Sequence, residues 1–287
     1  MAVTRLNEAL TDSSGVYFDA GALVAARQSA FQKIEIFDCP DLGRLMRIDG
    51  SNMTSERDEY FYHEALIHPA AIAHPHPQRV LIVGGGDGGA AEELLKHPIE
   101  RCRLCELDQA VVDMSRAHLG GIHGGAFDDA RLTLDIGDGM AFVRTSVGRA
   151  AGESFDLIYL DLTDPVGAAE PLYAPSFYQD CKRILNKGGA LVLHIGSPFS
   201  HPARVKQSLK ELRTEFAIVT PYFVHIPIYG AVWGFAVASD VLDIRQISAD
   251  AIDANLAVRS IEKRQLYNGA VHHAMLALPE YVKTLVA

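Results

Sequence analysis

The segment VLIVGGGDGGAAEELLK, residues 80–96, joins a β-branched apolar run to a glycine-rich turn and then to a stretch with helical spacing. Glycine permits positive φ and lets a ligand approach the backbone closely. A strand, a glycine turn and a helix in this order are typical of α/β folds that bind a nucleotide or nucleoside. We therefore expect a ligand site directly after this strand, at Gly84, Gly85, Gly86, Gly88 and Gly89.

The same rhythm continues along the chain. Buried parallel strands are expected at residues 79–83, 102–107, 130–136, 155–162 and 190–195. Helices are expected between them, at residues 90–97, 109–119, 176–185 and 202–212. Such alternation predicts an α/β fold, a doubly wound sheet with helices on both faces and with ligands at the carboxyl ends of the strands.

The first part of the chain has a different pattern. Short alternating segments such as VYFD, FQKIEIFD and GRLMRID are separated by Gly, Asp and Pro, which predicts a small antiparallel β module over residues 1–57. Residues 58–287 would then form the Rossmann-like catalytic domain, which includes a further strand-like run, WGFAVAS, at residues 233–239.

Composition limits the class of protein. With 287 residues, 48% hydrophobic and 22% charged, and no apolar run near 18 residues, the chain is expected to be globular, without a membrane partner and cytoplasmic. A net charge of −10 argues against a nucleic-acid partner and mildly favours cationic ligands. The four cysteines are interpreted as buried thiols: Cys39, Cys102, Cys105 and Cys181.

Acidic residues follow three of the expected strands. Glu106 ends the second strand, where an ionised carboxylate can accept hydrogen bonds from both ribose hydroxyls. Asp87 lies inside the glycine turn, where it would repel a pyrophosphate and attract an ammonium. Asp138 and Gly139 follow the third strand and could bind the edge of adenine, although an exposed loop aspartate is the alternative interpretation.

Two further acids crowd the turn after the fourth strand. In YLDLTDPVG, Asp161 and Asp164 could hold a cationic amine, and one of them could take the proton that an attacking nitrogen must lose. An Asx-turn leading into Pro165 would explain the same residues without any chemistry.

The glycine turn alone leaves other functions open. Gly84, Gly86 and Gly89 also satisfy G-x-G-x-x-G, so an NAD-dependent oxidoreductase is one alternative. An S-adenosylmethionine-dependent amine N-methyltransferase is a second alternative, and a non-catalytic binding or assembly protein that has kept the scaffold is a third.

Several motifs together resemble the polyamine aminopropyltransferases, in particular the spermidine synthases. The resemblance covers most of the chain. It rests on FQKIEIF (31–37), RIDGSNMTSERDEYFYHE (47–64), VLIVGGGDGG (80–89), CELD (105–108), DGM (138–140), DLTDP (161–165), WGFAVAS (233–239) and RQLYNGAVHHAMLALPEYV (264–282).

The resemblance implies a fold, a reaction and a set of residue roles. The fold would be a Rossmann-like sheet of the S-adenosylmethionine-dependent methyltransferase type. Decarboxylated S-adenosylmethionine, as co-substrate, would give its aminopropyl group to a polyamine, with putrescine giving spermidine and methylthioadenosine released; no metal or permanent cofactor is implied, and a homodimer is expected. Asp161 would be the proton acceptor, helped by Asp164 and Tyr62. Gln32 would lie near the nucleoside, while His63 and Tyr229 would contact the substrate.

The chain departs from the family pattern around the acceptor. Met53 and His194 stand where the family has glutamine, Leu162 replaces a small polar residue, and Ala168 replaces a proline. Met53 is interpreted as a packing substitution and His194 as a histidine that supports the site from behind. We therefore expect an altered acceptor pocket.

Overall fold

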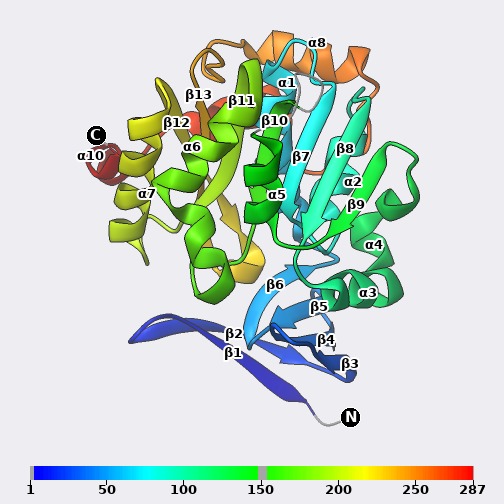
Figure 1. Cartoon of the computed structure of the whole chain (residues 1–287). Coiled ribbons are helices and arrows are strands. Elements are labelled where there is room, and N and C mark those ends of the chain that lie inside the picture. The colour runs from blue at the N-terminus through cyan, green and yellow to red at the C-terminus, as the bar shows by residue number, and fades with distance from the viewer. Residues whose placement is uncertain (1–2, 148–153, 287) are drawn as a thin grey trace.

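The computed structural model of the chain describes residues 3–147 and 154–286. Its centre is a seven-stranded sheet in the order β12-β13-β11-β10-β7-β8-β9 (Figure 1). The five strands expected from the sequence are all present and run parallel to their neighbours in this set: β7 (Arg79–Gly84), β8 (Arg101–Glu106), β9 (Leu132–Ile136), β10 (Phe155–Asp161) and β11 (Leu185–Gly196). The predicted Rossmann-like, methyltransferase-type sheet is confirmed.

An antiparallel hairpin completes the sheet. It consists of β12 (Ile218–Ile226), the short 3₁₀ helix η3 (Pro227–Tyr229) and β13 (Ala231–Ser239). β13 lies between β11 and β12 and is antiparallel to both. The sequence predicted β13 as a strand but not β12.

Helices cover both faces of the sheet. In Figure 1, the helices on the near face are α5, α6 and α7. Their bounds, with those of the C-terminal helix that packs on α7, are α5 (Gly139–Ser146), α6 (Pro175–Ile184), α7 (Pro202–Glu215) and α10 (Glu280–Val286). The other face is covered by α1 (Glu59–Ala73), α2 (Gly89–Leu95), α8 (Ala249–Val258) and α9 (Gly269–Leu276). None of the helices that the structure describes is long and apolar enough to cross a bilayer.

Two antiparallel sheets form the N-terminal part. One is the hairpin β1 (Thr4–Thr11) and β2 (Ser14–Ala20), and the other is the sheet β3 (Leu23–Gln28), β4 (Lys33–Cys39), β5 (Gly43–Ile48) and β6 (Ser51–Ser55). The second sheet packs through Ile34, Ile36 and Met46 against α3 (Gln109–His118) and α4 (Gly120–His123). The boundary proposed between residues 57 and 58 falls between β6 and α1, and its status as a domain boundary stays a prediction.

Helix α1 was not predicted from the sequence. It is buried on nearly all sides, so its apolar residues show no helical stripe. Pro69 lies inside it and lacks the N–H that would donate to the carbonyl of Ala65. The hydroxyl of Tyr222 donates to this carbonyl instead, at 2.9 Å. A side chain from β12 therefore supplies the donor that Pro69 lacks, and the carbonyl of Ala65 remains hydrogen-bonded.

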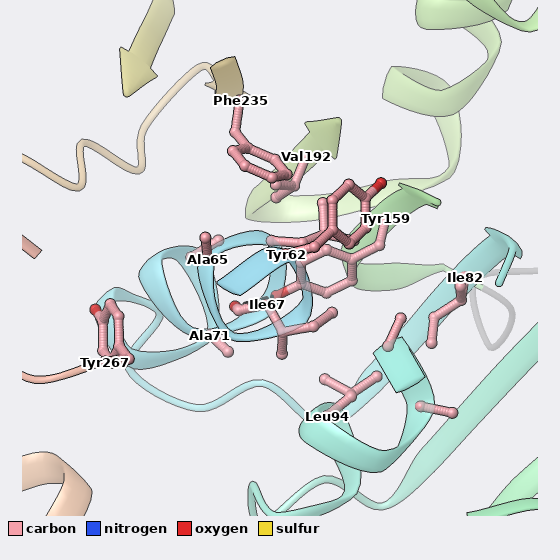
Figure 2. Packing of buried hydrophobic residues seen from close by; sticks show 14 of the residues in the cluster. Tyr62, Ala65, Ile67, Ala71, Ile82, Leu94, Tyr159, Val192, Phe235 and Tyr267 are labelled. Atoms are coloured by element: carbon pink, nitrogen blue, oxygen red, sulfur yellow. Dashed lines mark hydrogen bonds between the residues drawn. The ribbon is translucent and has the colours of Figure 1, made fainter. Parts of the chain in front are cut away.

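A second tyrosine fixes the same helix. The Tyr159 hydroxyl, from β10, donates to the carbonyl of Ile67 at 2.9 Å. Figure 2 shows α1 surrounded by the core, with Phe235 and Tyr159 on the sheet side and Tyr267 on the other side. Because the sheet and the C-terminal segment that contains Tyr267 both pack against α1, the side chains of its first turns have fixed positions.

The attachment of the tail to α1 gives a stability prediction. The buried carboxylate of Glu64 accepts hydrogen bonds from the backbone N–H groups of Gln265, Leu266 and Tyr267, at 2.6, 2.9 and 2.6 Å. Glu64→Gln replaces one acceptor oxygen by a donor and should lower the free energy of unfolding by about 1–3 kcal/mol, as measured by denaturant titration. Glu280→Gln, at an exposed position on α10, should change it by less than about 0.5 kcal/mol. Equal losses of stability in the two variants would contradict the stabilising role assigned to Glu64.

Candidate active site

A cavity opens at the carboxyl ends of β7, β8, β9 and β10, where the order of strands reverses. The N-terminal sheet closes one side of it through Met46, Ile48 and Met53. No lysine or arginine is found among the described residues that line it. Its charged lining consists of one histidine, His63, and six acids: Asp58, Glu59, Asp87, Glu106, Asp138 and Asp161.

The glycine turn allows two strand ends to meet. Gly84 has φ of 84°, and a Cβ there would lie 2.1 Å from the carbonyl oxygen of Asp161. The next residue, Gly85, donates its N–H to the same oxygen at 2.9 Å. This close approach brings Asp87, after β7, and Asp161, after β10, to the same part of the cavity.

The residues predicted from the sequence to bind the nucleoside also line the cavity. Gly86, Glu106, Asp138 and Gly139 all line it. Burial raises the pKa of Glu106 to about 7, although its carboxylate accepts the N–H of Asp108 at 2.9 Å. Asp138 lines the cavity and also accepts the N–H of Met140 as the cap of α5, and its contact with adenine stays a prediction.

Gln32 reaches the cavity from the turn between β3 and β4. Its side-chain amide donates to Asp108 at 3.2 Å, and the Ser29 hydroxyl donates to the same oxygen at 2.6 Å. Asp108 also caps α3 through the N–H of Ala110. Asp108 was not singled out in the sequence, although its place before a helical run is typical of a capping residue.

A compact group of titratable side chains lies at the centre. His63 is 2% exposed and holds Glu59 through Nδ1 at 2.7 Å and Asp87 through Nε2 at 3.5 Å. One nitrogen of His63 and one carboxylate oxygen from each of Asp87 and Asp161 lie within 4.8 Å of one another. Glu59 was not predicted, and the four-residue spacing from Glu59 to His63 would have indicated it only once the segment was known to be helical.

The charges in this group shift one another. Burial disfavours the charged form of His63, but Asp87 and Glu59 outweigh it and raise the pKa of the imidazole well above its ordinary value. Burial and the charge of Asp87 raise the pKa of Asp161 to about 6, against the opposing effects of His63 and a hydrogen bond from Tyr62. Asp161 is therefore a carboxylate whose proton affinity is close to that needed by a general base near neutral pH.

Asp164 is not brought into the cavity. Its carboxylate pairs with the Arg204 guanidinium at 2.7 Å, on α7, and is 48% exposed. Of the two acids predicted after the fourth strand, only Asp161 lines the cavity.

His194 supports the loop that carries both acids. Its Nε2 donates to the carbonyl of Leu162 at 2.9 Å and lies 2.6 Å from the Tyr173 hydroxyl, while Nδ1 accepts from Arg204 at 3.4 Å. Burial, together with the Arg204 charge, lowers the pKa of His194 to about 4, so the imidazole is neutral. Its position behind the cavity wall agrees with the interpretation from the sequence.

The other departures from the family pattern lie in the wall. Leu162 and Ala168 line the cavity beside Leu172. The side chain of Met53 lines it as well, and its carbonyl accepts the Tyr229 hydroxyl at 3.0 Å. The predicted residues Tyr62 and Tyr229 both line the cavity, so this wall is largely apolar and aromatic.

Comparison with known proteins gives a consistent result. Residues 59–246 match the model of the spermine/spermidine synthase domain. A polyamine aminopropyltransferase of Nitrosomonas europaea is 47% identical over 98% of this chain and 85% of its own length. A polyamine aminopropyltransferase of Sodalis glossinidius is 39% identical over 96% of this chain and 95% of its own.

Solved structures agree. A spermidine synthase in complex with the transition state analogue AdoDATO superposes with a TM-score of 0.90 at 33% identity, over 99% of this chain and 94% of that one. The spermidine synthase of Thermotoga maritima superposes with a TM-score of 0.89, also at 33% identity and with the same coverage.

The packing of the glycine turn gives a second stability prediction. Gly89 and Gly120 both begin helices, α2 and α4, where alanine normally stabilises by about 0.5–1 kcal/mol. A Cβ at Gly89 would lie 2.2 Å from the His63 ring, whereas one at Gly120 would meet nothing within 4 Å. Gly89→Ala should therefore destabilise by about 1–3 kcal/mol and Gly120→Ala should not, as measured by thermal unfolding. Stabilisation by Gly89→Ala would show that the ring is free to move.

Proposed function

Because the chain belongs to the spermine/spermidine synthase family and is a polyamine aminopropyltransferase, we propose that it moves the aminopropyl group of decarboxylated S-adenosylmethionine to putrescine. The products would be spermidine and methylthioadenosine. The observation that carries this proposal is the cavity itself, whose described lining residues include six acids and no lysine or arginine. Both proposed substrates are cations, and both would be attracted to such a site.

The donor would lie along the glycine turn. We propose that Glu106 accepts the ribose hydroxyls, that Asp138 and Gly139 bind adenine, and that Gln32 contacts the nucleoside. The backbone of Gly84, Gly85 and Gly86 would approach the ligand closely. Asp87 would hold the ammonium of the aminopropyl group, since the donor lacks the carboxylate of S-adenosylmethionine.

The acceptor would lie between Asp161, Tyr62 and Tyr229. Asp161 would take the proton that makes the attacking amine a nucleophile, because a protonated amine has no lone pair. The nitrogen then bonds to the carbon beside the sulfonium as the carbon–sulfur bond breaks and its electron pair returns to sulfur. Alignment of these atoms in a closed site would supply much of the acceleration.

Asp164 is proposed to act indirectly. Since Asp164 pairs with Arg204 outside the cavity, it would hold the loop after β10 and thereby position Asp161. His63, which lines the cavity, would lie near the substrate. Asp161 would then be the only base from this loop.

The alternative donors are less well supported. A nicotinamide enzyme would place a pyrophosphate at the turn that contains Asp87, where the carboxylate would repel it. A methyltransferase would place the carboxylate of S-adenosylmethionine in the same acidic region.

We also propose a homodimer in the cytoplasm. Apolar side chains on the N-terminal part are more than half exposed and could be covered by a second copy: Val3, Tyr17, Leu23 and Phe31. All four cysteines are free and buried, which fits a reducing compartment.

The decisive experiment is an assay of transfer. The protein would be incubated with decarboxylated S-adenosylmethionine and a panel of amines, and the products identified by mass spectrometry. Spermidine from putrescine is expected. Absence of product from every amine, or tighter calorimetric binding of S-adenosylmethionine than of its decarboxylated form, would overturn the proposal.

The role of Asp161 predicts a contrast between two neighbouring acids. Asp161→Asn removes the base and should lower kcat roughly 10²- to 10⁴-fold. Asp164→Asn should have a smaller effect, because that carboxylate pairs with Arg204 outside the cavity. An equal or larger loss in Asp164→Asn would mean that the wrong acid has been chosen.

Asp161 also predicts a pH dependence. The carboxylate is a base only in its ionised form, and its pKa is raised to about 6. The value of kcat/KM for putrescine should therefore fall as the pH drops through about 6. Binding of methylthioadenosine, measured over the same range, separates this effect from protonation of Glu106, whose pKa is about 7. A profile that is flat through this range would contradict the assignment.

A further inference from the structure

His63 is held where it cannot leave the cavity. Its ring packs against Gly89, where an added Cβ would lie 2.2 Å away, and Glu59 holds Nδ1 at 2.7 Å. The edge of the Tyr62 ring faces it at a centroid distance of 5.3 Å. The other nitrogen, Nε2, points to Asp87 at 3.5 Å. A ligand that approaches Asp87 must therefore share that carboxylate with the histidine.

Three acids lie close to the His63 ring. Glu59 and Asp87 bond to it directly, and Asp161 lies in the same group of ligand atoms. Three flanking elements contribute titratable groups. Asp58, Glu59 and Tyr62 come from α1 and the residue before it, Asp87 from the turn after β7, and Asp161 from the end of β10. Glu92, on α2, lies close enough to Glu59 for the charge of Glu59 to raise its pKa, together with burial and Glu93, whose effects are larger. The imidazolium form of His63 is thus the resident cation of a cavity whose other charged lining residues are acids.

We propose that His63 gives up its proton when the donor's ammonium binds Asp87, and later receives the proton that Asp161 takes from the acceptor amine. This inference rests on the proposed function, since it requires the aminopropyl cation in this cavity. Two cations on one buried carboxylate repel each other, and His63 is the one that can become neutral. Glu59 keeps the ring in place throughout, because Nδ1 retains its hydrogen and only Nε2 changes.

The protons balance over a cycle. Donor binding releases one proton from His63 to solvent. The acceptor enters as an ammonium, loses one proton to Asp161, and becomes a secondary ammonium when its nitrogen bonds to carbon and the sulfonium becomes a thioether. When the product leaves and removes the aminopropyl ammonium from Asp87, Asp161 passes its proton to the vacant Nε2 of His63, within the 4.8 Å group. The enzyme returns to its resting form, and the net release of one proton equals that of the overall reaction.

Methylthioadenosine provides a matched control ligand. It has the nucleoside of the donor but neither the ammonium nor the sulfonium charge. It should therefore bind without displacing the proton from His63. A purely structural histidine would respond alike to both ligands.

Nitrogen NMR of the enzyme with ¹⁵N-labelled histidine rings tests the idea directly. The ring shifts distinguish imidazolium from neutral imidazole, and His194, neutral with a pKa near 4, provides an internal reference. The His63 resonance is assigned by its loss in His63→Gln. We expect an imidazolium in the free enzyme and with methylthioadenosine near neutral pH, and a neutral ring with decarboxylated S-adenosylmethionine.

Calorimetry of the unmodified enzyme requires no variant. Donor binding measured in buffers of different ionisation enthalpy should release about one proton per site more than methylthioadenosine binding does, because ionisation of Glu106 is common to both ligands. An imidazolium that persists in the donor complex, or a neutral His63 in the free enzyme, overturns the inference while leaving aminopropyl transfer intact. Failure of the donor to bind at all would remove both.

The variant adds a kinetic measurement. His63→Gln can still donate to Glu59 but can hold no extra proton. It should lower kcat roughly 10-fold or more while the affinity for methylthioadenosine changes less than about threefold. Unchanged kcat would show that the acceptor's proton leaves by another route.

Discussion

The site depends on one close backbone contact, the hydrogen bond from the N–H of Gly85 to the carbonyl of Asp161. It pairs the ends of β7 and β10, which are far apart in the chain, at the point where strand order reverses. Only glycine fits at position 84, since a Cβ would lie 2.1 Å from that carbonyl. Two acids at the ends of different strands, Asp87 and Asp161, therefore face one cavity, and burial together with the charge of Asp87 raises the pKa of Asp161.

Helix α1 supplies the side chains that moderate this repulsion. Tyr222 and Tyr159 donate to two of its carbonyls, and one of these bonds replaces the N–H missing at Pro69. A helix held this firmly by the sheet can keep His63 buried between carboxylates. The core and the chemistry are thus connected, because the buried helix that stabilises the sheet also provides the only cationic group in the described lining of the cavity.

The sequence predicted the parts of this arrangement that depend on local pattern. The five parallel strands, the glycine turn and the acids at the strand ends follow from periodicity and position. Helix α1 and β12 could not be predicted in the same way, because a helix buried all round has no apolar stripe and Pro69 suggests a break. The pairing of Asp164 with Arg204 joins residues 40 positions apart on a loop and a helix, and no spacing rule indicates it.

That pairing bears on how the acceptor is selected. Arg204 neutralises Asp164, and neutral His194 links Arg204 to the carbonyl of Leu162, so the loop after β10 is held by charges outside the cavity. Inside, the loop presents Asp161 and an apolar wall that includes Leu162 and Ala168. The remaining acids on the side proposed for the acceptor, Asp58 and Glu59, come from the start of α1 rather than from the loop. Under the proposed function, discrimination among amines would arise from the length of the apolar wall and from its distance to α1, since an ammonium is stabilised only where one of these carboxylates can reach it.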